Sequence, residues 1–449
     1  MHLVGLLYSS DLSHGWLDIR TKIPLLILPL IFSTMPRLSK RDFIIVILIF
    51  SLSVVATWGT SLFHFFVDNP TDFRESFVFN SHIRLSIMAV IAFYFFLWLA
   101  ISDRFHLPKW TKIAFVFFAI FLIFSVVLLE VMSGLVLFLI SVAIFSIYFI
   151  VKGRGRLVQV LMLLLPLLLI GIGFYSYKTV NDYRTVDEVV NMEQKTKLGN
   201  IYLNLEDQFP IENGSPIGRQ ICWEEMKIGW NERSILDFDT SMINGYPLKF
   251  TLLRYLNSKG LSKDLEGVEQ MSLEDISFVE QGFANVEYTR KFSFKKRIYK
   301  LLWEYDMYSL GGDLNASSVI KRFYLWQTGV NLVKQNPIFG IGNGDVKKAF
   351  AEELIHQKSP LANSGLRTHN QWISLAIAFG IVGFIWFVFA FYYPVFYRKQ
   401  FDFLFMVVLL IYSMSMFWED SLETQIGVTI IAFFYPFLMF QNPFNSNQN

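Results

Sequence analysis

Residues able to do chemistry gather in the polar, glycine-rich stretch from Lys321 to Trp372. The stretch holds Arg322 with Trp326 four residues later, Asn336-Pro337 leading into Gly340, Gly342 and Gly344, and the run Arg367-Thr368-His369-Asn370. Arginine suits the binding of phosphate oxygens, and histidine suits proton transfer near neutral pH. Because a long apolar run follows directly, Arg367, His369 and Asn370 are expected at a membrane surface. We interpret the three groups as one site.

Three arginines, Arg219, Arg322 and Arg367, are candidates for binding a phosphorylated substrate. The guanidinium group grips phosphate oxygens in pairs and stays charged at every relevant pH. A single arginine of this kind is more commonly a solvated charge or part of a structural ion pair. A short repeat favours binding, since Ser215–Trp223 and Ser318–Trp326 both read S-x-I-x-R-x-x-x-W. Each serine is expected to cap a helix with Arg and Trp on one face, although coincidence and amphipathic packing also explain the pattern.

His369 is the candidate catalytic residue. It follows Arg367 by two positions and precedes Asn370 and an apolar run, so it is expected to cap or begin a transmembrane helix. Imidazole is the side chain most easily poised as a general base near neutral pH. The competing interpretation is a hydrogen-bonded structural histidine at a helix start. His356 is a rival, but its polar surroundings indicate a solvated loop.

Gly340, Gly342 and Gly344 allow tight turns and a close approach of the backbone to an anion, so Gly342 is a candidate for substrate binding. The pattern does not match a nucleotide-binding motif, because it follows Asn-Pro and not a strand. A structural turn is the default interpretation.

Acidic residues of the chain occur in isolated pairs without matching histidines. Metal sites need several oxygen or nitrogen ligands together, so the sequence predicts neither a metal nor a cofactor. Glu419 and Glu423 flank a short loop between the last two apolar runs and are expected to approach the site from the other side.

Composition indicates a membrane protein. The 449 residues are 53% apolar, 17% aromatic and only 17% charged, with a mean hydropathy of +0.42, which is too hydrophobic for an ordinary soluble domain. The formal net charge of +2 is too small to suggest nucleic-acid binding. The single Cys222 excludes an internal disulfide framework.

Nine apolar runs are candidates to cross a bilayer. They cover residues 22–35, 43–62, 84–102, 111–129, 134–151, 157–176, 371–395, 403–418 and 424–441. Every second loop between them carries Lys and Arg, as cytoplasmic loops do, and the intervening loops are acidic or nearly neutral. The pattern predicts an all-α polytopic membrane protein with residues 177–370 outside the cytoplasm.

Three domains follow from these spans. They are an N-terminal transmembrane bundle at 1–176, a large external domain at 177–370 and C-terminal transmembrane helices at 371–449. The span count also places residues 9–21 outside. The apolar Met1–Tyr8 is therefore expected to be the end of a further helix, so that the chain begins part-way through the natural design.

The external domain is expected to be mostly helical, because residues 219–233, 261–275 and 318–335 have helical apolar spacing. Glu212–Pro216 is expected to form a turn and a helix start.

Taken together, these motifs resemble the O-antigen ligase and polymerase superfamily. The resemblance lies in Arg322, Asn336–Gly342, Arg367–Trp372 and Phe379–Gly383, and it extends to Gly5–Ser9, to the large external loop and to Glu419–Gly427. It covers most of the chain topologically, but its specific motifs occupy roughly residues 322–383.

The resemblance implies a helical bundle like that of other lipid-linked glycosyltransferases of the GT-C type, with a large periplasmic domain and more helices upstream than this chain has. It implies a metal-independent enzyme of the bacterial inner membrane that moves a glycan from undecaprenyl diphosphate to an acceptor hydroxyl at the periplasmic face. His369 then matches the essential histidine of the family, and Arg219 and Arg322 match its diphosphate-contacting arginines. Arg367 and Asn370 are expected to orient either substrate.

The preferred hypothesis is an O-antigen ligase whose acceptor is the lipid A core. A polysaccharide polymerase and a protein O-oligosaccharyl ligase share the same motifs and stay open. A transporter or flippase is a different class, but it predicts polar residues inside the spans, where charges are nearly absent. A membrane receptor or scaffold without enzymatic activity predicts that changing His369 leaves glycan products unaltered.

Overall fold

The computed structural model shows a protein built almost entirely of α-helices, as expected. It describes residues 1–68, 73–102, 105, 107–129, 131–151, 156–186, 193–243, 245–290, 293–312, 314, 318–362 and 364–444. The chain divides into two compact units: unit 1 comprises Met1–Met162 and Lys321–Asn449, and unit 2 comprises Leu163–Ile320. The predicted domain boundaries after residues 176 and 370 refer to a membrane, and they stay a prediction.

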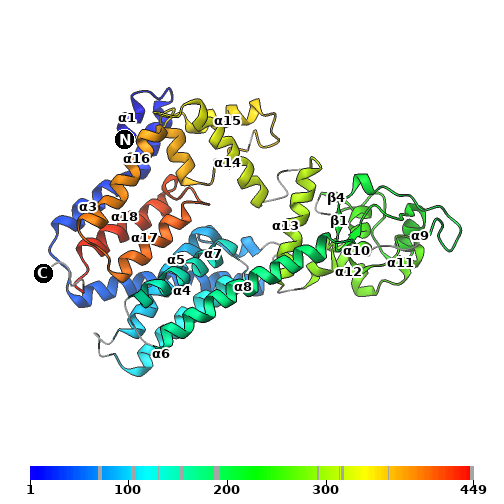
Figure 1. Cartoon of the computed structure of the whole chain (residues 1–449), viewed down its shortest axis with the longest axis horizontal. Helices are drawn as coiled ribbons and strands as arrows, with labels where there is room; N and C mark the ends of the chain where they lie inside the picture. Colours follow the sequence, from blue (N-terminus) through cyan, green and yellow to red (C-terminus); the bar gives the residue numbers. More distant parts are fainter. Residues whose placement is uncertain are drawn as a thin grey trace. The chain divides into compact units, whose positions relative to one another are not determined.

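Unit 1 contains the helices that precede α8 (Arg156–Arg184) and those from α14 onward (Figure 1). They are α1 (His2–Leu6), α2 (Leu12–Lys22), α3 (Pro24–Thr34), α4 (Lys40–Val67), α5 (His82–Ile101), α6 (Lys109–Leu128), α7 (Met132–Val151), α14 (Ser318–Gln335), α15 (Val346–His356), α16 (Gln371–Tyr397), α17 (Phe403–Ser415) and α18 (Gln425–Phe440), with short 3-10 helices η1 (Phe73–Ser76) and η6 (Ser421–Glu423). The two cuts between the units fall within α8 and within the first turn of α14, after Ile320. Each of the nine predicted apolar runs coincides with one of these helices.

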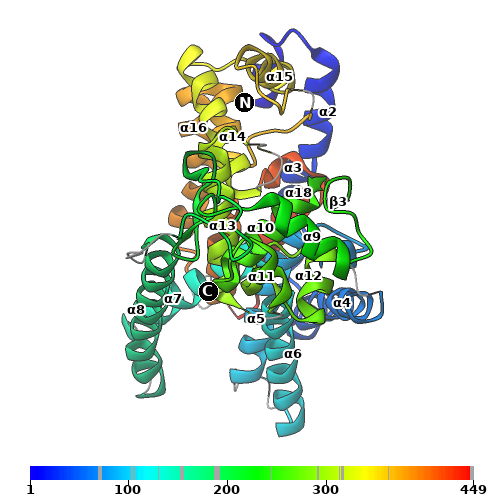
Figure 2. The same ribbon diagram turned by 90° about the vertical axis from the view of Figure 1, so that its right-hand side faces the viewer.

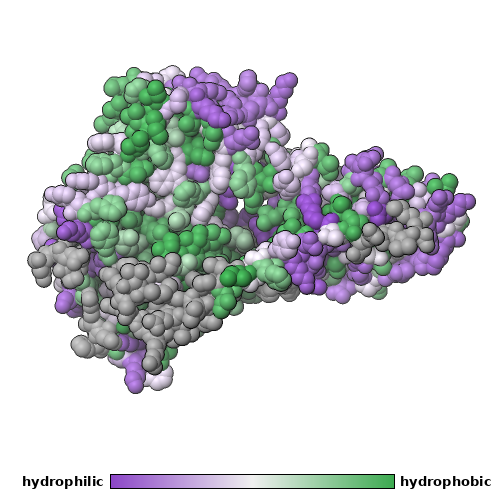
Figure 3. Space-filling model, viewed as in Figure 1, coloured by the Kyte–Doolittle hydropathy of each residue, from purple (hydrophilic) through white to green (hydrophobic). Residues whose placement is uncertain are grey.

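Hydropathy supports a membrane setting for unit 1. Among the described helices, α4, α5, α6 and α16 are long and apolar enough to cross a membrane, and shorter apolar helices occur in α7, α17 and α18. Hydrophobic residues gather over α16, and hydrophilic residues gather over α15 (Figure 3). The protein is therefore an all-α polytopic membrane protein. Its orientation stays a prediction, and the basic Arg104, Lys152 and Arg154 and the acidic Glu130 lie outside the described residues.

Helix α5 forms the centre of the helical bundle. It packs against α4, α6, α7 and α17, and Phe95 and Phe96 on it are completely buried. Phe43 of α4 stacks on Phe437 of α18 with ring centroids 4.9 Å apart. Burial of such aromatic side chains stabilises the bundle and fixes the loops at its ends.

Helix α16 is interrupted at Gly380, whose φ of 59° and ψ of −166° are not helical. The backbone groups released by this break bond to residues 337–344, which we call the glycine loop. Gly342 N–H donates to Ala378 O at 2.9 Å, and Ile381 N–H donates to Pro337 O at 2.8 Å. Because irregular backbone within an apolar helix is tolerated only when its polar groups are satisfied, the break fixes the loop against the helix.

Unit 2 has its own core. Its elements are η3 (Glu206–Gln208), β1 (Ile211–Glu212), β2 (Ser215–Pro216), α9 (Trp223–Arg233), β3 (Met242–Ile243), β4 (Tyr246–Pro247), α10 (Leu248–Lys259), α11 (Leu265–Glu269), α12 (Leu273–Glu280), η4 (Val286–Thr289) and α13 (Phe294–Ser309). Strands β1 and β2 pair antiparallel, as do β3 and β4. Figure 2 faces this unit and shows α9 to α12 gathered together; Trp230, Leu252 and Tyr255 lie completely buried among them.

Two predictions for this unit are wrong. Ser215 does not cap a helix, because it pairs in the β1–β2 hairpin and the helix begins only at Trp223. Asn213 and Gly214 have positive φ and make the hairpin turn, so the turn at Glu212–Pro216 is confirmed but the helix start is not. The run 261–275 is not one helix either, since α11 ends at Glu269 and α12 begins at Leu273.

Candidate functional site

His369 lies in a short non-helical segment directly before α16. Its φ is +50°, a left-handed conformation that is strained for a residue with a side chain. The prediction that His369 caps or begins this helix is wrong. Asn370 is the cap, because its Oδ1 accepts from the N–H groups of Trp372 and Ile373 at 3.0 and 3.2 Å. The side-chain oxygen of Asn370 is therefore engaged in capping, and the expected role of this residue in orienting a substrate stays a prediction.

Asp420 holds this strained turn in place. Its Oδ2 accepts from the backbone N–H of His369 at 3.0 Å, and its Oδ1 accepts from the hydroxyls of Thr368 and Ser374 at 3.2 and 2.9 Å. Burial and the nearby Glu423 together raise the pKa of Asp420 to about 6, although these hydrogen bonds act in the opposite direction. A buried carboxylate so well bonded fixes the backbone it contacts.

The imidazole of His369 is half-buried in a positively charged environment. Burial lowers its pKa below the usual 6.5; Glu419 opposes this effect, whereas Arg322, Lys321 and Arg84 add to it. The ring is therefore neutral at neutral pH, and a neutral imidazole can accept a proton. Within the part of the chain that the structure describes, the ring has no hydrogen-bond partner.

Arg322 is a half-buried cation without a close counter-ion. Among the described residues it makes neither a salt bridge nor a hydrogen bond. Burial lowers its pKa, Glu419 opposes this shift and Arg74 adds to it. A charge held away from water in this way favours binding of an anion.

Arg84 was not identified from the sequence as a site residue. Its Nη2 donates to Glu419 Oε1 at 3.1 Å, and Glu419 is only 5% exposed. A charged residue in the first turn of an apolar helix was the available signal. The pair brings the last loop of unit 1 to the site, as expected for Glu419.

Arg367, two residues before His369, makes its own set of contacts. Its Nη1 donates to Glu423 Oε2 at 3.3 Å and its Nη2 to His14 Nε2 at 3.4 Å. Gln371 Nε2 also donates to Glu423, at 3.0 Å. The expected approach of Glu423 is thereby found, but Arg367 contacts a different set of partners from His369.

Glu423 is the central acceptor of a polar cluster formed with Asp18, Lys22, Arg367 and Gln371. Lys22 Nζ donates to its Oε2 at 3.1 Å and also pairs with Asp18. Burial opposes ionisation of Glu423, but Lys22, Gln371 and Arg367 outweigh it and lower its pKa to about 2. The cluster encloses a cavity of about 20 Å³, enough for about one water molecule. It fixes the first helices to the site.

Gly342 is buried against the N-terminal segment. A side chain there would meet Ser9 Oγ at 2.2 Å and the Gly5 carbonyl at 2.8 Å. Its φ of +87° confirms the predicted turn. The neighbouring Gly344 N–H donates to Ser9 Oγ at 3.1 Å. In this structure Gly342 serves close packing, and a role in substrate binding stays a prediction.

Arg219 belongs to unit 2, whereas the other candidates belong to unit 1. Its guanidinium donates to both carboxylate oxygens of Glu206, at 2.8 and 3.3 Å. Lys263 Nζ bonds the carbonyl of the same arginine at 3.0 Å. Arg219 is therefore held in a local ion pair, and its contact with a diphosphate stays a prediction.

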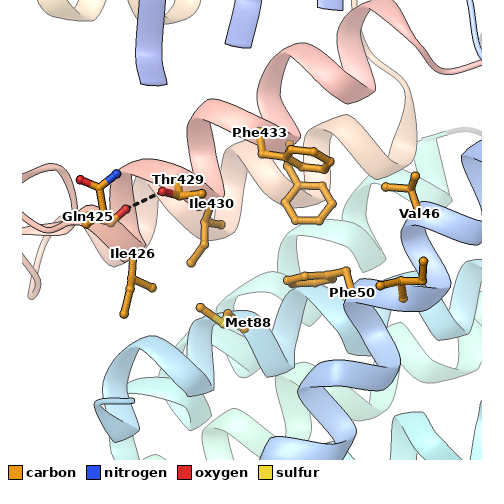
Figure 4. A pocket seen from close by; sticks show the side chains of 10 residues that line it. Val46, Phe50, Met88, Gln425, Ile426, Thr429, Ile430 and Phe433 are labelled. Atoms are coloured by element: carbon orange, nitrogen blue, oxygen red, sulfur yellow. Dashed lines mark hydrogen bonds between the residues drawn. The ribbon is translucent and has the colours of Figure 1, made fainter. Parts of the chain in front are cut away.

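An apolar cavity of about 490 Å³ lies among α4, α5 and α18 (Figure 4). Its walls include Phe50, Met88 and Phe433, and one end is formed by Gln425. Gln425 begins α18 two residues after Glu423. An apolar cavity thus begins beside the loop that carries the carboxylates of the site.

No group of three or more His, Cys, Asp or Glu residues in the described part of the chain is arranged to hold a metal ion. Metal independence stays a prediction.

The model of a protein family described as O-antigen ligase matches residues 290–388. This range contains Arg322, Gly342, Arg367, His369 and Asn370. No curated protein and no solved structure is similar enough to match the chain.

Proposed function

We propose that this protein transfers a glycan from an undecaprenyl-diphosphate carrier to an acceptor hydroxyl at the periplasmic face of the bacterial inner membrane. The match of residues 290–388 to the family model described as O-antigen ligase supports this proposal. The preferred acceptor is the lipid A core, which makes the protein a ligase. His369 is the general base and Arg322 binds the diphosphate.

The unpaired guanidinium of Arg322 beside His369 carries this proposal. A diphosphate brings negative charge, and arginine binds phosphate oxygens in pairs. Arg84 and Lys321 add positive charge around the same histidine, while Glu419 is already paired with Arg84. The site therefore favours an anionic leaving group next to a neutral imidazole.

The residues suit one displacement step. The acceptor oxygen attacks the anomeric carbon of the donor sugar as its proton passes to a ring nitrogen of His369. The bond between the anomeric carbon and the diphosphate oxygen breaks, and its electron pair leaves with the carrier diphosphate. Arg322 stabilises that charge, as positioned donors do in other transfer reactions.

The apolar cavity among α4, α5 and α18 suits the hydrocarbon chain of the carrier. Phe50, Met88 and Phe433 offer walls without charge, and burial of a hydrocarbon is favourable by about 25 cal/mol per Å². Because Gln425 at one end adjoins the Glu419–Glu423 loop, a carrier in this cavity would hold its diphosphate near the proposed base.

Glycan profiling of a deletion strain tests the function. A ligase predicts loss of long chains from the lipid A core while lipid-linked polymer accumulates, whereas a polymerase predicts acceptors that carry a single repeat. An unchanged profile would contradict both.

Purified Arg322→Lys is expected to keep only part of the transfer activity, because an ammonium group cannot make the paired contacts of guanidinium. Full activity of this variant would exclude the proposed role of Arg322.

A further inference from the structure

Unit 2 contains a cleft of about 730 Å³, within the range of about 300–1,000 Å³ common for small-molecule sites. Its lining comes from α10, α13, β3, β4, η3, η4, the first turn of α14 and the loops beside them. None of the residues assigned above to proton transfer or diphosphate binding lines it. The cleft therefore needs a separate explanation.

Aromatic side chains form much of the wall. They are Phe209, Tyr246, Phe250, Tyr288, Trp303 and Tyr308. Tyr246 is 53% exposed and Tyr308 is 39% exposed, so both rings are accessible. Aromatic rings present a flat apolar face together with polar edges. A sugar ring has the matching chemistry, since its C–H face is apolar and its hydroxyls lie around the edge.

Arg254 and Glu212 make the Trp303 wall rigid. The guanidinium carbon of Arg254 lies 3.3 Å from the centre of the Trp303 ring. The same guanidinium donates to both carboxylate oxygens of Glu212, at 3.0 and 2.8 Å. Its charge is thereby neutralised by a buried partner and is not free to attract a phosphate.

Two polar groups of the cleft have no protein partner. Among the described residues, neither the Thr251 hydroxyl nor the Trp303 indole N–H makes a hydrogen bond, although Thr251 is only 7% exposed. Neither polar atom is fully buried, so water or a ligand in the cleft can satisfy each of them. Sugar hydroxyls both donate and accept, so they can bond to both groups.

A hydrocarbon chain suits this cleft less well than the apolar cavity of unit 1. The cleft wall is interrupted by Gln208, Thr251, Arg254, Lys300 and Glu304. A hydrocarbon would desolvate these groups without replacing their hydrogen bonds. The mixture of rings and polar groups favours a carbohydrate.

We infer that the cleft between α10 and α13 is a non-catalytic subsite for a segment of oligosaccharide, held by ring packing and hydrogen bonds. The inference rests on the proposed glycan transfer for the class of ligand. The segment belongs either to the glycan of the donor or to that of the acceptor, and the chemistry is the same for both.

Binding to the purified full-length protein in detergent tests the subsite. Two probes are used: an oligosaccharide of a few repeats released by mild acid from the cell's own polysaccharide, and the core oligosaccharide released from its lipid A. Tyr308→Ala is the main variant. Tyr305→Ala is its matched control, because Tyr305 is on the same helix and 54% exposed but does not line the cleft. Thr251→Val removes the hydroxyl with little change of shape.

Tyr308→Ala and Thr251→Val are each expected to weaken binding of one probe by about threefold or more, the effect of losing about 0.7 kcal/mol of ring or hydrogen-bond contact. Tyr305→Ala should bind like the wild type. The probe that responds identifies the donor or the acceptor glycan as the source. Equal binding by all variants, or no binding of either probe by the wild type, would overturn the subsite.

Transfer activity separates the two proposals. If His369→Ala abolishes transfer while the Tyr308 and Thr251 variants bind both probes normally, the subsite is wrong and the proposed function stands. If the wild type binds a probe in a Tyr308-dependent way but transfers no glycan, the subsite stands and the proposed function is wrong.

Discussion

The backbone N–H of His369 donates to Oδ2 of Asp420 at 3.0 Å, across a separation of 51 residues. This bond holds His369 at a φ of +50°, a conformation that costs about 1–3 kcal/mol for a residue other than glycine. The carboxylate of one loop thus positions the imidazole of another.

Asp420→Ala is expected to lower the transfer rate by about tenfold or more, since relief of strain on the order of 1–3 kcal/mol allows the turn to relax. The turnover rate of the purified variant should fall more than its affinity for the donor, because Arg322 is left in place. A variant with the turnover of the wild type would show that Asp420 does not position His369.

The pH dependence of transfer is expected to report the lowered pKa of His369. A general base must be unprotonated, so activity is lost as the pH falls through that pKa. The acid limb of the rate profile should therefore lie below pH 6.5. Glu419→Gln should move the limb further down, because Glu419 raises the pKa of His369.

Glu352→Gln is the control for this profile, because Glu352 is exposed on α15 and is not among the charges that shift the pKa of His369. Its profile should match that of the wild type. An acid limb at or above pH 6.5 in the wild type, or an upward move in Glu419→Gln, would conflict with the assigned environment of His369.

Glu423→Gln is expected to destabilise unit 1 by on the order of 3 kcal/mol, since it removes the acceptor of Lys22 and Arg367 and leaves buried charge behind. Thermal unfolding in detergent measures the loss. Glu266→Gln breaks the Lys197–Glu266 pair, in which Lys197 is largely exposed, and should change the unfolding temperature little.

The sign of the pH effect follows from the lowered pKa of Glu423. Its stabilisation is complete above its ordinary pKa of 4.5 and is lost as the pH falls toward about 2. The gap in unfolding temperature between wild type and Glu423→Gln should therefore narrow over that window. A gap that is absent at neutral pH, or that widens in acid, would count against the buried ion pairs.

Much of unit 1 follows from the sequence, because a membrane helix needs an apolar run of known length. All nine predicted runs are helices, and the break at Gly380 is the main departure. His369 and Arg322 could be proposed from the sequence because their side-chain chemistry is visible in a short stretch. Two further contacts could not be predicted, because each joins residues distant in sequence: Asp420 accepts from the His369 backbone, and Arg84 pairs with Glu419.

The repeat at Ser215–Trp223 shows why local patterns fail. The first copy of the sequence pattern forms a hairpin strand and a turn, whereas the second copy begins a helix at Ser318. Positive φ at Asn213 and Gly214 and the ladder between Ile211 and Pro216 decide the first copy. Tertiary pairing overrode the helical spacing, as it does when propensity is weak.

Gly380→Ala is expected to destabilise the glycine loop, because an added side chain would lie 2.3 Å from the Ile338 backbone and Gly380 has a φ of 59°. The loss is about 1–3 kcal/mol. Gly59→Ala in α4 is the matched control, since no atom lies within 4 Å of the added carbon. Equal unfolding temperatures for the two variants would show that the break in α16 is not a fixed feature.

The most direct measurement is the turnover and donor affinity of purified His369→Ala. A general base contributes about 10²–10⁴-fold in rate, so turnover should fall by that factor while the affinity for the undecaprenyl-diphosphate donor stays within about twofold of the wild type. Weaker donor binding with retained turnover would assign His369 to the diphosphate instead. Near-normal turnover and affinity would contradict the central claim that His369 is the base.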